Sequence, residues 1–140
     1  MKFEFKHFND LSLDELYDIL RLRAEIFVVE QDCVYNDIDD LDKDAIHQFV
    51  RKNGEVIAYS RLLKPGTRFP DYSIGRVVVK KTERGTGLGI KMMEEAKAFI
   101  LNNRKAPKIK ISAQKYLQKF YEDLGFKVVT KEYLEDGIPH

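Results

Sequence analysis

The chain contains three glycines at alternate positions, Gly85, Gly87 and Gly89. A β-branched apolar run, Ile74 with Val77 to Val79, precedes them and is typical of a buried strand. From Leu88 onward the apolar residues recur at helical spacing. A helix that begins behind glycines presents unpaired backbone N–H groups and a positive dipole end. This order favours binding of a bulky anion such as a pyrophosphate, although a tight turn that needs glycine for geometry alone also fits.

Two common phosphate-binding loops do not fit this stretch. No Gly-Lys-Ser/Thr follows the glycines, so it is not a Walker A loop. The dinucleotide fingerprint requires its third glycine at position 90, which is Ile90. The segment Arg84-Gly85-Thr86-Gly87-Leu88-Gly89 resembles instead the Arg/Gln-x-x-Gly-x-Gly/Ala signature of the GCN5-related N-acetyltransferases (GNAT). In that family the loop holds the pyrophosphate of acetyl-CoA.

The resemblance implies a binding site for acetyl-CoA. Its implied members are Val77, Val78, Val79, Arg84, Gly85, Thr86, Gly87, Leu88, Gly89 and Gln114. The three valines would offer main-chain hydrogen bonds to the pantetheine arm, and their strand and residues 108–112 would splay apart to admit it. The side chain of Arg84 is either a ligand or structural. The basic residues Arg104, Lys105, Lys108 and Lys110 fit either the 3′-phosphate of CoA or a solvated basic turn.

Acetyl transfer to an amine requires a proton acceptor for the amine and a donor for the leaving sulfur. An alkyl amine has a reference pKa of about 10.4, and a thiol of about 8.5 leaves better once it is hydrogen-bonded. Tyr121 lies in Phe120-Tyr121-Glu122-Asp123-Leu124-Gly125-Phe126, which is similar to the family's Phe-Tyr-x-x-x-Gly-Phe segment. Its position on an apolar helix face predicts a core aromatic. The resemblance implies that its hydroxyl faces the CoA sulfur and acts as the donor.

Two residues are candidates for the catalytic base. Glu30 ends the first predicted helix and His47 begins the next predicted strand. Each could take the amine proton directly or through water, and each could equally be a structural polar residue. A nucleophilic pair of Cys33 with His47 is disfavoured, because no third group is evident that would orient the histidine.

Residues 32–44 carry six aspartates among few apolar residues. An EF-hand that starts at Asp40 would place Ala45 where glycine is required and Arg51 where the bidentate glutamate belongs, so calcium binding is not expected. The pattern predicts a solvated acidic loop. A mouth that attracts a cationic amine substrate is the functional alternative.

The composition of the 140 residues indicates one ordinary globular domain, since 44% are hydrophobic and 34% are charged. Lys and Arg number 24 and Asp and Glu 23, which does not favour nucleic acid or an anionic membrane as partner. No apolar run approaches the roughly 20 residues of a membrane span. A single cysteine excludes an internal disulfide and favours a reducing, cytoplasmic location. Similar proteins continue after this point into a final short strand, whereas this sequence stops at His140. We therefore expect either a version of the protein without that strand or a truncated chain.

Alternating strand and helix signals position these residues. We expect a strand over 2–7, a helix from 13 to about 28, a hairpin of 45–51 and 55–63 around Asn53-Gly54, and the central strand and helix described above. The sequence then predicts a strand over 108–112, a helix over 114–124 and a strand over 126–133, followed by a turn-rich tail. The first helix has an apolar stripe that consists of Leu13, Leu16, Tyr17, Leu20, Ala24 and Phe27. This order predicts an α/β (α+β) fold, with a mixed sheet and helices on both faces.

The resemblance covers nearly the whole chain and narrows to the ElaA-type branch. It is most specific at residues 22–39 and in Glu135-Asp136-Gly137-Ile138-Pro139-His140. It implies a single GNAT N-acetyltransferase domain over residues 1–140, with a mostly antiparallel sheet and direct transfer of acetyl from acetyl-CoA to a primary amine, without a metal. The acceptor is a small molecule, a polyamine or a protein amine, and a homodimer is compatible. Two alternatives remain: a CoA-binding sensor without catalysis, and a nucleotide-binding regulator.

Overall fold

The computed structural model describes residues 2–32, 36–103 and 109–111, together with residues 122, 134–135 and 138–139. Its main feature is a five-stranded sheet in which sequence order and spatial order coincide. The strands are β1 (Glu4–His7), β2 (Ile46–Lys52), β3 (Glu55–Leu63), β4 (Tyr72–Val79) and β5 (Ile109–Ile111). The first three pairings are antiparallel and β4 pairs with β5 in parallel. The prediction of a mixed, mostly antiparallel sheet is therefore confirmed.

The hairpin of β2 and β3 forms where the sequence predicts it. Asn53 and Gly54 join the two strands, and both have left-handed backbones, with φ of 54° and 78°. Two successive positive φ values make the twisted two-residue turn that suits adjacent antiparallel strands. This hairpin supplies the centre of the sheet, and β3 is buried along nearly all of its length.

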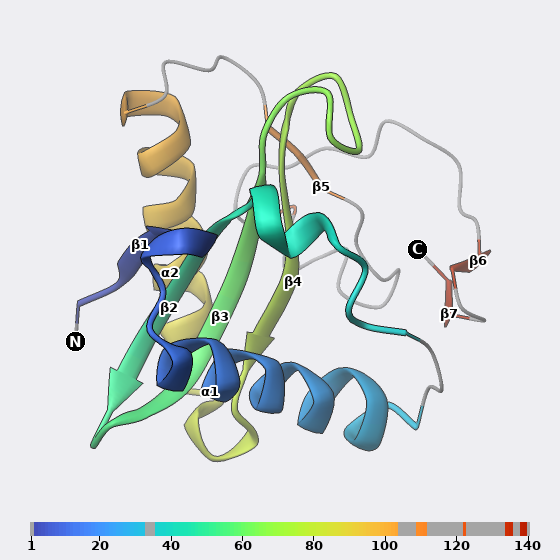
Figure 1. The fold of residues 1–140 in the computed structure, drawn as a ribbon. Helices are drawn as coiled ribbons and strands as arrows, with labels where there is room; N and C mark the ends of the chain where they lie inside the picture. Colours follow the sequence, from blue (N-terminus) through green and yellow to red (C-terminus); the bar gives the residue numbers. More distant parts are fainter. Residues whose placement is uncertain are drawn as a thin grey trace.

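The two long helices cover opposite faces of the sheet (Figure 1). Helix α1 (Leu13–Arg23) begins with the expected capping box, in which Ser12 and Glu15 each accept a hydrogen bond from the other's backbone N–H. Helix α2 (Leu88–Ala98) packs Met93, Ala96 and the following Ile100 against the other face. Shorter helical turns complete the fold: η1 (Phe8–Asp10), η2 (Ala24–Glu30), η3 (Leu41–Asp44), η4 (Lys81–Glu83) and η5 (Phe99–Asn103).

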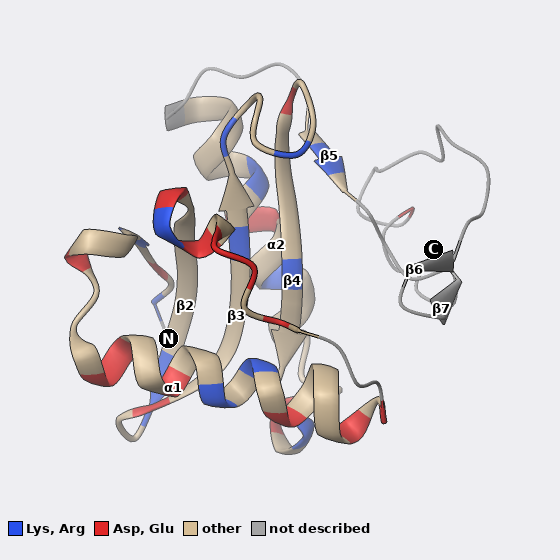
Figure 2. Ribbon diagram, turned by 45° about the vertical axis from the view of Figure 1, so that its right-hand side comes forward, with Lys and Arg blue, Asp and Glu red and all other residues tan. Residues whose placement is uncertain are grey.

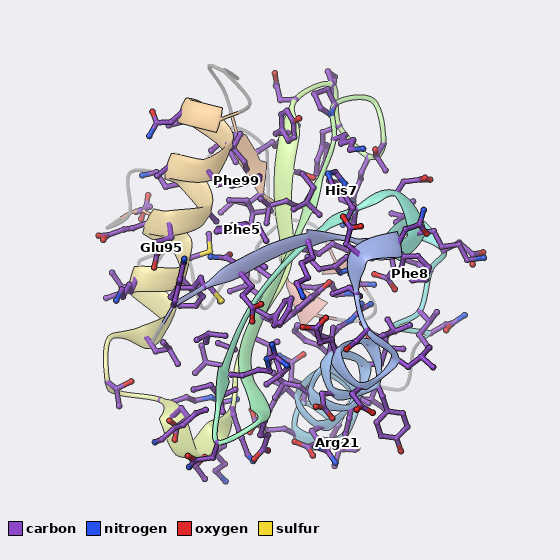
Figure 3. The ribbon with its side chains drawn as sticks, turned by 60° about the vertical axis from the view of Figure 1, so that its left-hand side comes forward. Phe5, His7, Phe8, Arg21, Glu95 and Phe99 are labelled. Atoms are coloured by element: carbon purple, nitrogen blue, oxygen red, sulfur yellow. The ribbon has the colours of Figure 1, made fainter. Side chains whose placement is uncertain are left out.

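The edge strand β1 is tied to the α2 layer by an aromatic pair. The rings of Phe5 and Phe99 stack with centroids 4.3 Å apart and an interplanar angle of 3°. Figure 3 shows Phe5 reaching from β1 towards Phe99 at the end of the helix. Phe3 is buried in a second apolar cluster, which includes Leu88 and Met92 from the first half of α2. The two phenylalanines of the first strand thus lie on one face, as their alternation predicts.

The apolar stripe predicted for the first helix is confirmed at Phe27, which is buried, and wrong at Leu13 and Tyr17, which are 86% and 68% exposed. The buried residues are Glu15, Ile19, Leu22, Arg23, Ile26 and Phe27. Glu15 and Arg23 belong to this buried face although they are charged. A helical pattern of apolar residues alone therefore identifies the wrong face of the helix. The helix also ends its regular part at Arg23 and continues as the wider turn η2 to Glu30, rather than running regularly to Val28.

The end of the chain contributes two short strands, β6 (Leu134–Glu135) and β7 (Ile138–Pro139), which pair antiparallel where a turn-rich tail was expected. The predicted helix over 114–124 lies outside the described residues except for residue 122, and the predicted strand over 126–133 lies outside them entirely. Among the helices of the described residues, none combines the length and the apolar character needed to cross a membrane.

Candidate functional site

The glycine loop lies between the end of β4 and the start of α2, as the sequence predicts. Strand β4 ends at Val79, and after the short turn η4 the chain reaches Gly85 and Gly87, whose φ values are 79° and 82°. Both are left-handed conformations that residues with a Cβ adopt only under strain. Gly89 lies within the first turn of α2. Two of the three glycines are therefore explained by backbone conformation.

The first turn of α2 has no side-chain cap. Its N-cap is Gly87, no side chain accepts from the first-turn N–H groups at this cap, and no acidic residue stands in that turn. The hydroxyl of Thr86 donates to the carbonyl of Glu83 at 2.8 Å, so this side chain does not cap the start of α2. Free N–H groups at a helix start attract an anion through hydrogen bonds and through the helix dipole. The arrangement can therefore hold a phosphate or pyrophosphate group.

Arg84, which opens the loop, connects it to two other parts of the protein. Its Nε donates to the carbonyl of Val79 at 3.1 Å, and its Nη2 donates to Glu30 at 2.7 Å. Glu30 ends η2, so this ion pair brings a residue 54 positions away to the edge of the loop. The side chain of Arg84 thus has a structural function in the described contacts, and binding through the backbone N–H groups of the loop stays a prediction. Glu30 is placed next to the candidate anion site.

One edge of β4 beyond Ile74 is not paired with β5 within the described residues. The parallel pairing joins Tyr72, Ser73 and Ile74 to residues 109–111, whereas β3 pairs with β4 as far as Val79. Val78 is buried against α1, and Val77 and Val79 are half-buried. The course of the chain after residue 111 lies outside the described residues, so the splaying of the two strands stays a prediction.

Residues 36–42 are here called the acidic segment. Three of their four aspartates are bound to arginines, whereas the exposed Asp40 pairs with Lys43. Asp42 accepts from Arg23 at 2.8 Å and from Arg61 at 3.0 Å, and Asp39 is bound by both terminal nitrogens of Arg61 at 2.7 and 3.0 Å. Figure 2 shows the acidic segment crossing in front of β3 and β4, which carry Arg61 and Arg76. Both interpretations drawn from the sequence are therefore wrong for Asp37, Asp39 and Asp42. Their carboxylates bind arginines of this chain instead of water or a cationic substrate.

Burial and ion pairing compete in this cluster. Burial alone would raise the pKa of Asp42, but the hydrogen bonds and charges of Arg23 and Arg61 outweigh it and hold this pKa below 3.8. The pKa of Asp39 is lowered in the same way by Arg61 and Arg76. Burial would lower the pKa of Arg23, yet its neighbours Asp37 and Asp42 raise it. Asp39 and Asp42 are therefore ionised throughout the neutral range, and their ion pairs with Arg61 and Arg23 hold the acidic segment against the sheet.

His47 has a structural role in this cluster. The residue is fully buried, its Nε2 lies 2.8 Å from the carbonyl oxygen of Asp42, and its Nδ1 lies 2.6 Å from the hydroxyl of Tyr59. A carbonyl only accepts, so Nε2 carries the proton and Nδ1 accepts from Tyr59. Burial lowers the pKa of His47 below 6.5, and the nearby charges of Arg23 and Arg61 lower it further against the opposing effect of Asp42. With both nitrogens engaged, His47 is not placed to take a proton from an amine.

The lowered pKa of His47 predicts a loss of stability in weak acid. Below pH 6.5 the unfolded chain protonates this histidine while the folded protein does not, so the free energy of unfolding falls until the pH reaches the folded pKa. The slope is at most about 1.4 kcal/mol per pH unit for one proton. A second decline is expected below 3.8, where the unfolded carboxylates of Asp39 and Asp42 take up protons before the folded ones. Urea titrations between pH 8 and 3 measure both steps.

Two histidine variants assign the first of these steps. His47→Gln removes the titrating group, so we expect its free energy of unfolding to stay level between pH 7.5 and 5. His7→Gln, at an exposed position of β1, should retain the slope of the wild type. A slope that survives in the His47 variant would show that another group carries it.

Several predicted site residues lie outside the described residues. These are Tyr121, Gln114, Cys33, Arg104, Lys105 and Lys108. Lys110 is described, and its Nζ lies 4.6 Å from the centre of the Phe69 ring. This contact engages Lys110 with the loop between β3 and β4, as expected for a residue packed at the surface.

The sequence analysis missed the arginines Arg23, Arg61 and Arg76, which organise the acidic segment. The available signal was their position inside apolar patterns. Arg23 follows Ile19 by one helical turn, and Arg61 stands between buried residues of a strand. A charged residue in such a position implies a buried partner of opposite charge, and residues 36–42 carry four aspartates within seven positions.

Comparisons with known proteins agree with this fold and loop. The pattern of the Acetyltransferase (GNAT) domain family matches residues 13–140. Protein ElaA of Escherichia coli is 41% identical over 136 residues, which are 96% of this chain and 89% of ElaA. Its crystal structure superposes with a TM-score of 0.87 at 36% identity, covering 99% of this chain and 96% of that one.

Two further solved structures are similar. An acyl-CoA N-acyltransferase from Pseudomonas aeruginosa has a TM-score of 0.93 at 42% identity, covering 100% of this chain and 96% of that chain. A predicted acetyltransferase from Clostridium acetobutylicum, solved with acetyl-CoA, has a TM-score of 0.67 at 20% identity, covering 96% of this chain and 94% of that chain. The second likeness concerns the fold alone.

Proposed function

The chain belongs to the GNAT acetyltransferase family, and from this premise we propose that it transfers the acetyl group of acetyl-CoA directly to a primary amine. The acceptor is a small molecule, a polyamine, or a lysine or N-terminus of a protein. We further propose that one domain spans residues 1–140, that the protein acts in the cytoplasm without a metal, and that a homodimer is compatible with this activity. Neither nucleic acid nor a membrane is part of the proposal.

The observation that carries this proposal is the uncapped start of α2 behind two left-handed glycines. Gly85 and Gly87 bring the main chain into a conformation that leaves the first-turn N–H groups without a side-chain acceptor at the cap. After the turn η4, this loop follows the part of β4 that has no pairing with β5 within the described residues. With its pyrophosphate at the loop, acetyl-CoA would extend its pantetheine arm along Val77, Val78 and Val79, and the thioester would lie further along this strand. A predicted acetyltransferase of the same fold was solved with acetyl-CoA, which agrees with this choice of donor.

The proposed reaction is attack of a neutral amine on the thioester carbonyl carbon. The new C–N bond forms, the C–S bond breaks, and the amine loses a proton to a base. Glu30 remains the candidate for this base, directly or through water, because it lies at the edge of the loop whereas His47 is enclosed. The hydroxyl of Tyr121 would donate to the leaving sulfur, which lowers the cost of releasing a thiol of pKa about 8.5.

Tyr121→Phe tests the proposal and separates it from the sensor alternative. We expect CoA release in a thiol assay to fall about 100-fold, the lower range for general acid–base catalysis, while the Kd for acetyl-CoA stays within about twofold. Calorimetry gives the Kd, and a panel of primary amines from polyamines to lysine peptides gives the turnover. Tyr17→Phe, at a tyrosine that is 68% exposed on α1, is the matched control and should change neither value.

Other outcomes point elsewhere. A natively folded wild type that does not bind acetyl-CoA would refute the donor site. Binding without turnover across the whole panel would favour a sensor that holds CoA without catalysis. Competition of ATP or NAD with CoA for the loop would favour the nucleotide-binding regulator.

A further inference from the structure

Arg76 has a backbone conformation that is unfavourable for its residue type. Among the described residues, four that are not glycine have a positive φ: Asp32, Asp40, Asn53 and Arg76. Aspartate and asparagine tolerate the left-handed region, whereas a long side chain such as arginine rarely adopts it. Arg76 has a φ of 50° in the middle of β4, although its neighbour Gly75 does not have a positive φ. The strain is therefore retained at a position where glycine would relieve it.

This conformation makes a β-bulge in the central strand. Strand β3 pairs Tyr59 with Val78 and Arg61 with Gly75, so the register shifts by one residue between the two pairs. Arg76 and Val77 together face Ser60, which is the count expected of a bulge. A left-handed first residue is normally glycine in such bulges. Another requirement must favour arginine here.

The side chain of Arg76 supplies that requirement. Its Nε donates to Asp37 Oδ1 at 2.7 Å, and its Nη2 donates to the Asp37 carbonyl at 3.2 Å and to Asp39 Oδ2 at 3.3 Å. The side chain is 19% exposed and that of Asp37 is 8% exposed, so these contacts are shielded from water. Three contacts to two aspartates tie the acidic segment to the bulge more strongly than a surface pair would.

The bulge lies at the border between two parts of the β4 edge. Within the described residues, pairing with β5 reaches Ile74, two residues before Arg76, and Val77 follows directly after Arg76. The edge assigned above to the pantetheine arm therefore begins at the residue that holds the acidic segment. A change in the position of the acidic segment would therefore shift the β4 backbone that is proposed to bind the pantetheine arm.

We propose that Arg76 is a positioning residue for acetyl transfer, which links the acidic segment to the cofactor edge of β4. The ion pairs offset the strain of the left-handed backbone, so the bulge and the segment stabilise each other. The inference rests on the proposed function. Because linkage is reciprocal, acetyl-CoA that fixes the edge must also fix the segment, and loss of the tether must weaken cofactor binding by the same factor.

Substitutions at position 76 separate the backbone from the side chain. Arg76→Gly and Arg76→Asn keep the left-handed conformation accessible and remove the tether. If the bulge alone mattered, both variants would behave at least as well as the wild type. If the tether matters, hydrogen–deuterium exchange of residues 36–42 should become about tenfold faster or more, as expected for the loss of charge-assisted hydrogen bonds. The matched control is Arg51→Asn, which removes a strand arginine that pairs with Glu4 and Glu15 and makes no contact with the acidic segment in the described ion pairs.

Titration with acetyl-CoA completes the test. In the wild type we expect acetyl-CoA to slow exchange in residues 36–42, and in both variants we expect this slowing to disappear while the Kd rises about three- to tenfold. Wild-type exchange in the glycine and asparagine variants would overturn the tether. Faster exchange with an unchanged Kd would overturn the link to the cofactor. If the wild type does not bind acetyl-CoA, the proposed function and the link to the cofactor both fail, whereas faster exchange in the free variants would still establish the tether.

Discussion

Asp42→Asn should lower the free energy of unfolding by about 3–5 kcal/mol, the cost of removing one partner from a buried ion pair. Arg23 and Arg61 both donate to the same oxygen of Asp42, at 2.8 and 3.0 Å. Their side chains are 0% and 1% exposed, so neither guanidinium can exchange its lost partner for water. The amide keeps the shape of the carboxylate but removes its charge. Urea denaturation at pH 7 measures the change.

Asp44→Asn provides the comparison for this prediction. Asp44 is two residues further along the same chain segment, but it is exposed. A substitution at such a surface position should change stability by no more than about 0.5 kcal/mol. If the aspartates of residues 32–44 were a solvated loop, the two variants would be equally mild. Equal effects would therefore contradict the arginine cluster, and a difference of several kcal/mol would support it.

Gly87→Glu should raise the Kd for acetyl-CoA by about 100-fold or more. A Cβ at this glycine meets no atom within 4 Å, so the side chain has room, but its carboxylate stands at the start of α2 where the pyrophosphate is proposed to bind. A second negative charge about 4 Å from a phosphate oxygen costs about 4 kcal/mol at an intermediate effective dielectric constant. That cost exceeds the roughly 2.8 kcal/mol that corresponds to 100-fold. Calorimetric titration measures the effect.

Gly66→Glu is a matched control for backbone strain. Gly66 has a φ of 86°, close to the 82° of Gly87, and a Cβ there also meets no atom within 4 Å. Both substitutions should therefore cost about 1–2 kcal/mol of stability through the left-handed backbone. Gly66 lies in the loop between β3 and β4, at the opposite end of the sheet from the start of α2 (Figure 1), so its substitution should leave the Kd within about twofold. Equal weakening in both variants would assign the effect to strain and remove the anion site.

Local sequence signals determined much of the fold and the candidate anion site. The capping box at Ser12, the Asn53-Gly54 turn and the order of strand, glycine loop and helix each depend on residues close together in the chain. Such signals act through backbone conformation and through hydrogen bonds within a few residues, so they can be interpreted without a fold. The same stretch carried the resemblance to the GNAT family, which the comparisons confirm.

The tertiary structure decided which charged residues are buried and what they bind. Arg23, Arg61 and Arg76 come from a helix and two strands, and they meet the acidic segment only because the sheet and α1 bring them together. From the sequence alone, an aspartate-rich segment indicates solvent exposure, since the cost of burying a carboxylate depends on partners far away in the chain. The same cluster encloses His47 and holds Arg23 on the buried face of α1, whereas Glu15 on that face pairs with Lys6 and Arg51. These outcomes follow from long-range ion pairs, which no local pattern encodes.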